Sequence, residues 1–349
     1  EDGDVFFAID RFPDYGKLSK RRIEEMDAGH RIEIRESKRN PLDFVLWKQA
    51  REGEVCWDSP WGKGRPGWHI ECSAMSARCL GKTFDIHGGG PDLLFPHHEN
   101  EIAQSEAAHG CEFARQWMHA GAVRVNHEKM SKSLGNFFTI REVLKNHAPE
   151  VIRYFIVASH YRSPIDYSED SLREATAALT RLYNCFRDLY ADMRLTPPDG
   201  LDGDALGPAG DLAFGSTAAV EPYRLRFEEA MDDDFNTPAA LAVLFDMAKH
   251  INNLRKTDRN AAVELALGMV ALARPLGLLQ CAPDRLLQGL VDPQSGLTAS
   301  AIEELIAARA SARAGRDWAE SDRIRTLLLE QGIVLNDTRE GTTWTRQDR

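Results

Sequence analysis

A lysine-containing loop is the first segment whose residue types and spacing could do chemistry. It reads KMSKSLGN from Lys129 to Asn136, after an expected strand at 122–125 and before a helix expected to begin near Ile140. Lysines beside small hydroxyl residues can place ammonium groups where negative charge develops on a triphosphate. Two lysines at this spacing are more often a solvated surface loop, so the spacing alone leaves both interpretations open.

A glycine-rich turn is the second such segment. The stretch FDIHGGGPDLLFPHHENEIAQSE, residues 84–106, predicts a strand, a turn and a helix that begins near His97. Glycines let backbone approach a nucleotide closely at the carboxyl end of a parallel strand. We therefore expect Gly89 and Gly90 at a nucleotide site, with Asp92 as a hydrogen-bond partner for a ribose. HGGG could also be the oxyanion loop of a lipase, but the Gly-x-Ser-x-Gly elbow that a lipase needs does not occur in the sequence.

The helix after this turn carries a possible pair of metal ligands. His97 and Glu101 are four residues apart and share one helix face. A metalloprotease HExxH helix would need histidine at position 102, where the chain has Ile102. Such a pair is more often a surface hydrogen bond than a metal site. Cys72, in a second expected helix that begins within GWHIECSAM, favours the metal because it could supply a third ligand.

The elements that must position these residues belong to an α/β segment. Up to residue 147, short strand patterns such as the one at 4–10 alternate with Gly and Pro turns. From 148 to 280 the apolar spacing is helical, interrupted by a Pro-, Gly- and Asp-rich loop at 195–215. One helix is expected to start at Asn236 or Thr237 as N-cap, because Pro follows in its first turn.

The end of the chain predicts a small separate module. A linker at 281–300 should lead into two short helices broken at Gly315 and a terminal hairpin, together spanning 301–349. The net charge of -11 neither supports nor excludes an RNA partner, because it averages over all faces of the molecule. Six scattered cysteines favour a reducing, cytoplasmic location, and no apolar run approaches the roughly 18 to 20 residues that span a bilayer.

Together these segments resemble the cysteinyl-tRNA synthetase family. KMSKS followed by LGN is the signature loop of class I aminoacyl-tRNA synthetases, and GWHIECSAM, the HGGG segment and KMSKSLGNFFT occur here in the family's order and spacing. MDDDFNTP matches the family's helical domain. The resemblance implies a partial Rossmann-like α/β fold, the C-terminal half of the catalytic domain, over 1–147. An α-helical bundle domain over 148–280 and a small α+β anticodon-binding module over 301–349 would follow.

The resemblance also implies a zinc site. In the family, two Cys, one His and one Glu hold a zinc ion, and three of those positions correspond to Cys72, His97 and Glu101. The fourth ligand, a cysteine, belongs to an N-terminal part with a His-Ile-Gly-His signature, and neither occurs in this sequence. The zinc is expected to bind the thiolate of the substrate directly. This bond discriminates against serine more strongly than the shape of a pocket could. Pocket contacts that differ by one methylene group supply only about 1 to 3 kcal/mol.

The implied reaction is ATP-dependent activation of L-cysteine, with Mg²⁺, to cysteinyl-adenylate, followed by transfer to tRNA(Cys). Positioning and charge stabilisation do most of this work, so no nucleophile-base pair is required. Trp68 would line the cysteine pocket, although packing in the core is an equally open alternative. The residues assigned to ATP and its phosphates are Gly89, Gly90, Asp92, Lys129 and Lys132.

The C-terminal module should contact the anticodon if the resemblance holds. Arg309, Arg313 and Arg316 recur on one helix face that could meet phosphates or bases. Trp318 and Trp344 could stack on an anticodon base. No lysine occurs after Lys256, so the arginines could also reflect composition alone.

Two other interpretations stay open at this stage. A ligase that joins activated cysteine to an amino sugar in mycothiol synthesis shares the zinc site and the KMSKS loop, but the module after residue 301 favours the synthetase. The chain could also be a catalytically incomplete tRNA-binding fragment, because it starts inside an expected fold at 4–10. We therefore expect the 349-residue chain alone not to catalyse cysteine-dependent ATP-pyrophosphate exchange, and we expect a monomer that does not associate with membranes.

Overall fold

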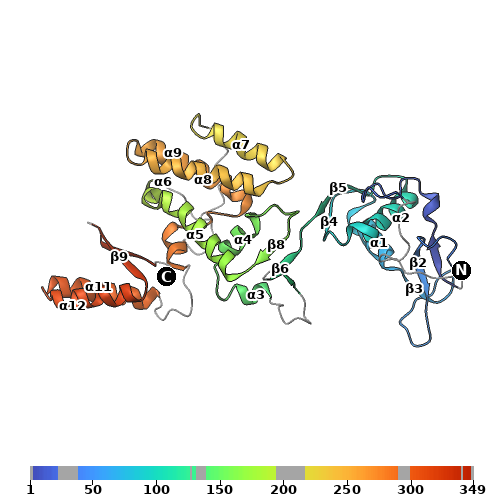
Figure 1. Ribbon diagram of the computed structural model, residues 1–349, viewed down its shortest axis with the longest axis horizontal. Helices are drawn as coiled ribbons and strands as arrows, with labels where there is room; N and C mark the ends of the chain where they lie inside the picture. The colour runs from blue at the N-terminus through green and yellow to red at the C-terminus, as the bar shows by residue number, and fades with distance from the viewer. Residues whose placement is uncertain are drawn as a thin grey trace. The chain divides into compact units, whose positions relative to one another are not determined.

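The computed structural model, shown in Figure 1, describes residues 3–22, 38–125, 128–130, 139–193, 217–289, 299–338 and 341–346. The chain divides into two compact units. The first contains Glu1–Ala122 and Arg162–Pro164, and the second contains Val123–Tyr161 and Ile165–Arg349. Each unit has its own packed interior.

The first unit combines two small sheets with two helices. An antiparallel sheet has the order β1 (Val5–Phe7), β2 (Phe44–Gln49) and β3 (Gly64–Pro66), and β4 (Phe84–Gly89) pairs in parallel with β5 (Ala114–His119). The helices are α1 (Trp68–Leu80) and α2 (Glu99–His109), and a π-helical turn, Leu94–His98, precedes α2. The predicted helix starts near Trp68 and His97 are thereby confirmed.

The strand expected at 4–10 is shorter than predicted. β1 ends at Phe7, and Ile9–Arg11 form a 3-10 turn instead. The backbone N–H of Ile9 donates to the Asp43 carboxylate at 3.1 Å, and the Ile9 side chain is fully buried. Alternation in the sequence could not reveal a turn that depends on a carboxylate 34 residues away.

Helix α2 is buried on nearly all sides although much of its sequence is polar. Ile102 and Ala103 pack into two different apolar clusters, one around Phe84 and Phe113 and one around Ile9. The buried polar residues of this helix are Glu99, Asn100, Glu101, Gln104 and Ser105. Burial of polar groups costs free energy unless they are paired or bind a ligand, so this helix is a candidate for function.

The second unit begins with a three-stranded sheet. Its order is β7 (Glu128–Lys129), β6 (Val123–Val125) and β8 (Ile165–Tyr167). Two short helices follow β7 in the chain, α3 (Ile140–Val143) and α4 (Pro149–Val157). Thr139 and Glu142 form a reciprocal capping box that fixes the predicted start of α3.

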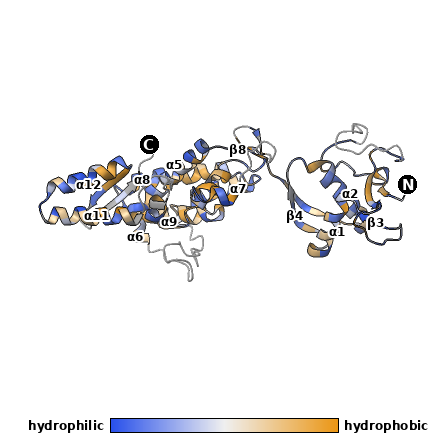
Figure 2. Ribbon diagram, turned by 90° about the horizontal axis from the view of Figure 1, so that it is seen from below, coloured by the Kyte–Doolittle hydropathy of each residue, from blue (hydrophilic) through white to orange (hydrophobic). Residues whose placement is uncertain are grey.

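A helical core fills most of the second unit. Its other helices are α5 (Glu169–Phe186), α6 (Tyr190–Met193), α7 (Glu221–Asp232), α8 (Thr237–Leu254), α9 (Arg259–Ala273) and α10 (Pro283–Gly289). Apolar and polar residues alternate along these helices, as Figure 2 shows, which is typical of helices around a shared core. Asn236 caps α8 by accepting from Ala239 N at 3.2 Å, as predicted. The loop predicted at 195–215 lies outside the described residues.

The prediction that residues 281–300 form a linker is wrong in part. Residues 283–289 form α10, which begins at Pro283, and Leu286 and Leu287 are buried in the helical core. Arg187 donates to the Asp284 carboxylate at 2.6 Å and ties the new helix to the end of α5. Such a short helix is stabilised by tertiary packing, which a Pro-rich local sequence does not reveal.

The C-terminal segment has the predicted elements. Helices α11 (Ala299–Ala314) and α12 (Trp318–Glu330) are separated around Gly315, and β9 (Ile333–Thr338) and β10 (Gly341–Arg346) form an antiparallel hairpin. Their shared core contains Ile302, Ile306, Ile324, Leu328, Ile333 and Trp344. No helix in the described ranges is both long and apolar enough to cross a membrane.

Candidate metal centre

The candidate metal ligands lie on two helices that local sequence brings together. Gly67 separates β3 from α1, and a Cβ at this position would lie 2.0 Å from the carbonyl oxygen of Val45. Only glycine therefore permits the close turn that starts α1 beside β2. The side chain of Gln104 on α2 donates to Ser73 Oγ and to the carbonyl of His69, both at 2.6 Å, and fixes α1 against α2.

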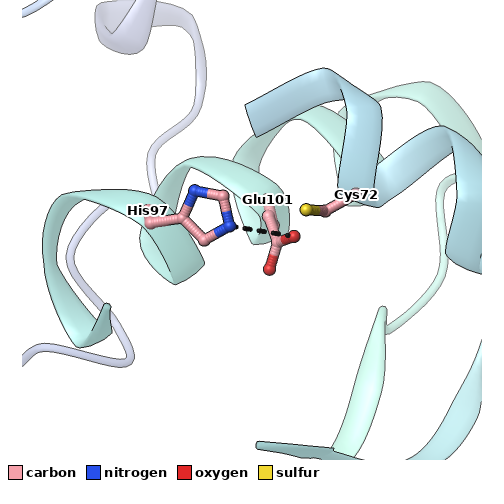
Figure 3. Close-up of side chains that lie close together, drawn as sticks. All are labelled: Cys72, His97 and Glu101. Carbon is pink, nitrogen blue, oxygen red and sulfur yellow. Dashed lines mark ion pairs between the residues drawn. The ribbon is translucent and has the colours of Figure 1, made fainter. Parts of the chain in front are cut away.

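Cys72, His97 and Glu101 converge as the sequence predicts. Their ligand atoms all lie within 4.8 Å of one another, and His97 Nε2 is 3.5 Å from Glu101 Oε1. Figure 3 shows the thiol and the imidazole pointing toward the carboxylate from α1 and from the π-helical turn before α2. The triad combines one sulfur, one nitrogen and one oxygen ligand, a set typical of zinc.

Glu101 tests whether these residues fit a cation. Its side chain is 0% exposed, and neither carboxylate oxygen accepts a hydrogen bond from the described residues. His87 Nε2 lies 2.8 Å from Oε2, but without the alignment of a hydrogen bond. A buried carboxylate faced only by imidazoles and a thiol is costly to keep charged, and a divalent cation between Glu101, Cys72 and His97 would offset that cost. The residues therefore fit a zinc ion.

The protonation states of the triad agree with this interpretation. Burial, with the negative charge of Glu101, raises the pKa of the Cys72 thiol to about 11. Burial lowers the pKa of His97, so its imidazole is neutral and keeps a lone pair for a ligand. A raised pKa favours the protonated thiol of Cys72. A bound cation would favour the thiolate instead, because the thiolate is the form that binds metal.

A network of histidines surrounds the triad, and sequence reasoning missed it. His69 and His97 lie 2.8 Å apart between their Nδ1 atoms, and His98 Nδ1 lies 2.8 Å from His119 Nε2. Burial lowers the pKa of His69 to about 4 and that of His98 to about 3, so both rings are neutral near pH 7. The signal was available in the sequence, since six of the eleven histidines lie between positions 69 and 119.

A second possible ligand group shares the same carboxylate. The ligand atoms of His87, His98 and Glu101 also lie within 4.8 Å of one another. Since Glu101 belongs to both groups, the two compete for one carboxylate. The group with Cys72 contains the only thiol of the two, and sulfur is the softer ligand that zinc favours over many competing cations.

Trp68 and the glycine turn flank this cluster. The Trp68 ring lies 4.5 Å from that of His97 and is 60% exposed, so it is not a core residue. A Cβ on Gly89 would lie 2.8 Å from the His98 ring, and one on Gly90 would lie 2.5 Å from Asp92 Oδ1. The two glycines thus leave space for the side chains of His98 and Asp92. Their role in binding ATP stays a prediction.

The two lysines of the KMSKS loop are only partly described. Lys129 ends β7 and pairs with Arg124 of β6, which fixes where the loop departs from the sheet. The side chain of Lys129 and all of Lys132 lie outside the described residues. Their catalytic role is therefore still an expectation from the sequence.

Two residues predicted to meet RNA are structural instead. Arg309 is buried, and its two terminal nitrogens each donate to Asp337 at 2.8 Å. Trp344 is buried in the core of the C-terminal segment and donates to Glu303 Oε1 at 2.7 Å. The hypothesis that they contact the anticodon is wrong, because both are already covered and paired. Trp318 remains exposed.

The geometry can now be compared with known proteins. Residues 1–177 match the family described as tRNA synthetases class I (C) catalytic domain, residues 226–280 match the DALR domain, and residues 296–344 match the cysteinyl-tRNA ligase anticodon binding domain. A cysteine–tRNA ligase from Hahella chejuensis is 60% identical over 344 residues, covering 99% of this chain and 70% of that protein. The chain belongs to the cysteine–tRNA ligase family.

Further relatives agree with this assignment. Cysteine–tRNA ligases from Marinobacter nauticus and Ectopseudomonas mendocina are 56% and 58% identical, over 99% and 98% of this chain and 70% and 69% of their own lengths. A solved LeuRS–tRNA–LeuAMS complex from Agrobacterium radiobacter K84 has a TM-score of 0.49 at 16% identity, covering 67% of this chain and 33% of that chain.

Membership in the cysteine–tRNA ligase family decides between the synthetase and the mycothiol-pathway ligase. The function is ligation of cysteine to tRNA, with a class I catalytic domain followed by DALR and anticodon-binding domains. The mycothiol-pathway alternative is not supported, because the relatives are tRNA ligases and the last domain is their anticodon-binding domain. The domain boundaries at 147, 280 and 301 stay predictions.

Proposed function

We propose that this cysteine–tRNA ligase selects its amino acid at a zinc site held by Cys72, His97 and Glu101. The observation that carries the proposal is the convergence of a thiol and an imidazole on a fully buried carboxylate that accepts no hydrogen bond from the described residues. When bound, zinc supplies a soft electrophilic site that prefers a thiolate to a hydroxyl, which is the chemical difference between cysteine and serine.

The residues around the triad shape the pocket for the amino acid. The Trp68 ring stacks on that of His69 at 5.3 Å, lies tilted against that of His97 at 4.5 Å, and keeps much of its surface open. This exposure favours a role in the wall of a pocket over one in the core. His69 and His98 are neutral, so they add hydrogen-bonding groups to the pocket without adding positive charge. The charges of the triad therefore dominate the local electrostatic field.

The reaction uses this pocket in two steps. A carboxylate oxygen of cysteine attacks the α-phosphorus of ATP, and pyrophosphate leaves with the bonding electron pair. A hydroxyl of the terminal ribose of tRNA then attacks the carbonyl carbon, and AMP leaves. We assign Lys129 and Lys132, with Mg²⁺, to the negative charge that builds on the phosphates in the first step.

The parallel pair β4 and β5 supports a Rossmann-like site for ATP. Ligands of such sheets bind beyond the carboxyl ends of the strands. β4 ends in the glycine turn with Gly89, and β5 ends at His119, beside His98 of the cluster. We therefore keep Gly89, Gly90 and Asp92 as the residues nearest the nucleotide.

The state of the cysteines bears on the location of the protein. All six cysteines are free thiols, which suits a reducing compartment such as the cytoplasm. We propose a cytoplasmic monomer with L-cysteine, ATP and tRNA(Cys) as its partners.

Removal of zinc should abolish the preference for cysteine. Dialysis of the purified protein against a metal chelator is expected to weaken L-cysteine binding by at least about 100-fold, because it removes the zinc–thiolate bond that L-serine does not form. L-Serine binding should not change. Calorimetric titrations before dialysis, after dialysis and after zinc is restored test this, and a chelated protein that still prefers cysteine would contradict the proposal.

A further inference from the structure

Helix α1 carries Cys72, yet very little of this helix is buried. Of its 13 residues, all of which the structure describes, Ser73 is the only buried one. Met75 and Leu80 on the same helix expose 58% and 61% of their surface. Most helices in proteins are fixed by an apolar face that packs against the core. Because α1 has little such packing, other contacts must decide where it holds the thiol of Cys72.

A buried amide on α2 supplies such a contact. Gln104 is 5% exposed, and its Nε2 donates at 2.6 Å both to the carbonyl oxygen of His69 and to the hydroxyl of Ser73. A backbone carbonyl can only accept, so the amide must turn its NH2 group toward α1. The Oε1 atom of Gln104 accepts no hydrogen bond from the described residues. The hydrogen bonds of this side chain within the described part of the chain therefore all go to α1.

The hydroxyl of Ser73 continues this contact to the backbone of a metal ligand. It accepts from Gln104 and donates to the main-chain carbonyl of Glu101 at 3.4 Å, and Ser73 is itself 5% exposed. Hydrogen bonds between buried groups are stronger than the same bonds in water. Gln104 and Ser73 therefore join the backbones of α1 and α2 through a short chain of buried polar groups, the Gln104–Ser73 bridge.

This bridge lies beside the ligands on both helices. On α1, Ser73 directly follows Cys72, and on α2 the bridge ends at the carbonyl of Glu101 itself. The ligand atoms of Cys72 and Glu101 lie within 4.8 Å of each other. Metal sites tolerate deviations of only about 0.2 Å in the distance from ligand to ion. A small slide of α1 along α2 would therefore take the thiol out of reach of a cation held by the carboxylate.

We propose that Gln104 and Ser73 are positioning residues, which hold Cys72 at the distance from Glu101 that the metal requires. The inference rests on the proposed function, since it takes zinc as the ion that these ligands hold. Neither Gln104 nor Ser73 belongs to the ligand group, so both act through the ligands. Loss of a residue that orients metal ligands typically lowers the metal affinity by about 10- to 100-fold.

The test measures the zinc affinity of the native full-length protein and of two bridge variants. Gln104→Leu keeps most of the side-chain volume but removes both donors, and Ser73→Ala removes the hydroxyl while favouring the helix. Each variant should lower the zinc affinity by about 10- to 100-fold in competition with a chromophoric chelator. The double variant should lose less than the product of the two single effects, because the two residues form one bridge.

Cobalt(II) in place of zinc gives a readout that a loss of stability alone would not move. The thiolate is the form of cysteine that binds metal, and its bond to Co²⁺ has a charge-transfer absorption band. Cys72→Ala marks the band intensity that remains without this thiolate. With Co²⁺ at saturation, well below the melting temperature, Gln104→Leu and Ser73→Ala should bring the band toward the Cys72→Ala intensity.

Tyr15→Phe is the matched control in the same unit. It removes a buried hydrogen bond from the Tyr15 hydroxyl to Asn100 of α2, but it leaves the contact between α1 and α2 intact. Loss of one buried hydrogen bond should lower the melting temperature, as it should in the bridge variants. Tyr15→Phe should nevertheless keep the zinc affinity and the cobalt band of the unsubstituted protein.

The outcomes separate this inference from the proposed function. If both bridge variants lose zinc affinity and band intensity while Tyr15→Phe keeps them, the inference stands. If either quantity stays at the unsubstituted value in the bridge variants, the inference is overturned and the zinc site is retained. If Tyr15→Phe changes both quantities as much as the bridge variants do, the effect is one of stability and the inference is also overturned. An unsubstituted protein that binds no zinc would overturn the proposed function together with the inference.

Discussion

Replacement of Glu101 by Gln should leave the protein folded but unable to retain zinc. Glutamine preserves the shape of the buried side chain, but it removes the negative charge beside Cys72 and His97. Loss of an outer-shell partner already weakens metal binding by about 10- to 100-fold, so loss of a direct ligand should exceed roughly 100-fold. After gel filtration, elemental analysis should fall from one zinc per chain to less than about a tenth.

Glu106 on the same helix provides the matched control. Its carboxylate accepts from Phe113 N at 3.2 Å and pairs with Lys17, outside the ligand cluster. Glu106→Gln should therefore keep its zinc, even if the melting temperature falls slightly. Cys72→Ala should lose zinc as Glu101→Gln does. Full zinc content in either ligand variant would remove that residue from the site.

The second large effect is expected in the KMSKS loop. Replacement of Lys132 by Ala removes a positive charge that we place on the phosphates of ATP as pyrophosphate leaves. Loss of one such preorganised group typically lowers kcat by about 10² to 10³. Because the interaction strengthens in the transition state, kcat should fall more than the KM for ATP rises. Cysteine-dependent ATP-pyrophosphate exchange by the native full-length protein is the assay.

Lys145 serves as the control for Lys132, since it is an exposed lysine just after α3 and outside the motif. Lys145→Ala should retain at least half of the exchange rate. Zinc content and L-cysteine binding should be unchanged in both lysine variants, because neither lysine belongs to the triad. A decrease of less than about tenfold for Lys132→Ala would mean that the loop does not stabilise the reacting phosphates.

The convergence of the candidate metal ligands was predictable in part from sequence, for a physical reason. His97 and Glu101 share a helix face through a spacing of four residues, and that relation is local. Nothing local relates residue 72 to residue 97, so Cys72 on its own helix was only a possible third ligand until the family resemblance assigned it to the same site. The elements themselves followed from local signals such as the Asn236 cap and the break at Gly315.

The remaining features depend on contacts between distant parts of the chain. The histidine network joins side chains from α1, β4, the π-helical turn before α2, and β5, and only the fold brings His98 to His119. Arg309 and Trp344 were open to a role in RNA binding until their pairing with Asp337 and Glu303 was visible. Helix α10 likewise owes its existence to packing of Leu286 and Leu287 rather than to its own sequence.

X-ray absorption at the zinc edge counts the sulfur atoms bound to the metal, so it reports whether zinc binds the thiol of the substrate. Addition of L-cysteine to the zinc-loaded protein should raise this count by one, and L-serine should leave it unchanged. A sulfur count that stays the same with L-cysteine present would show that the metal does not read the thiol of the substrate.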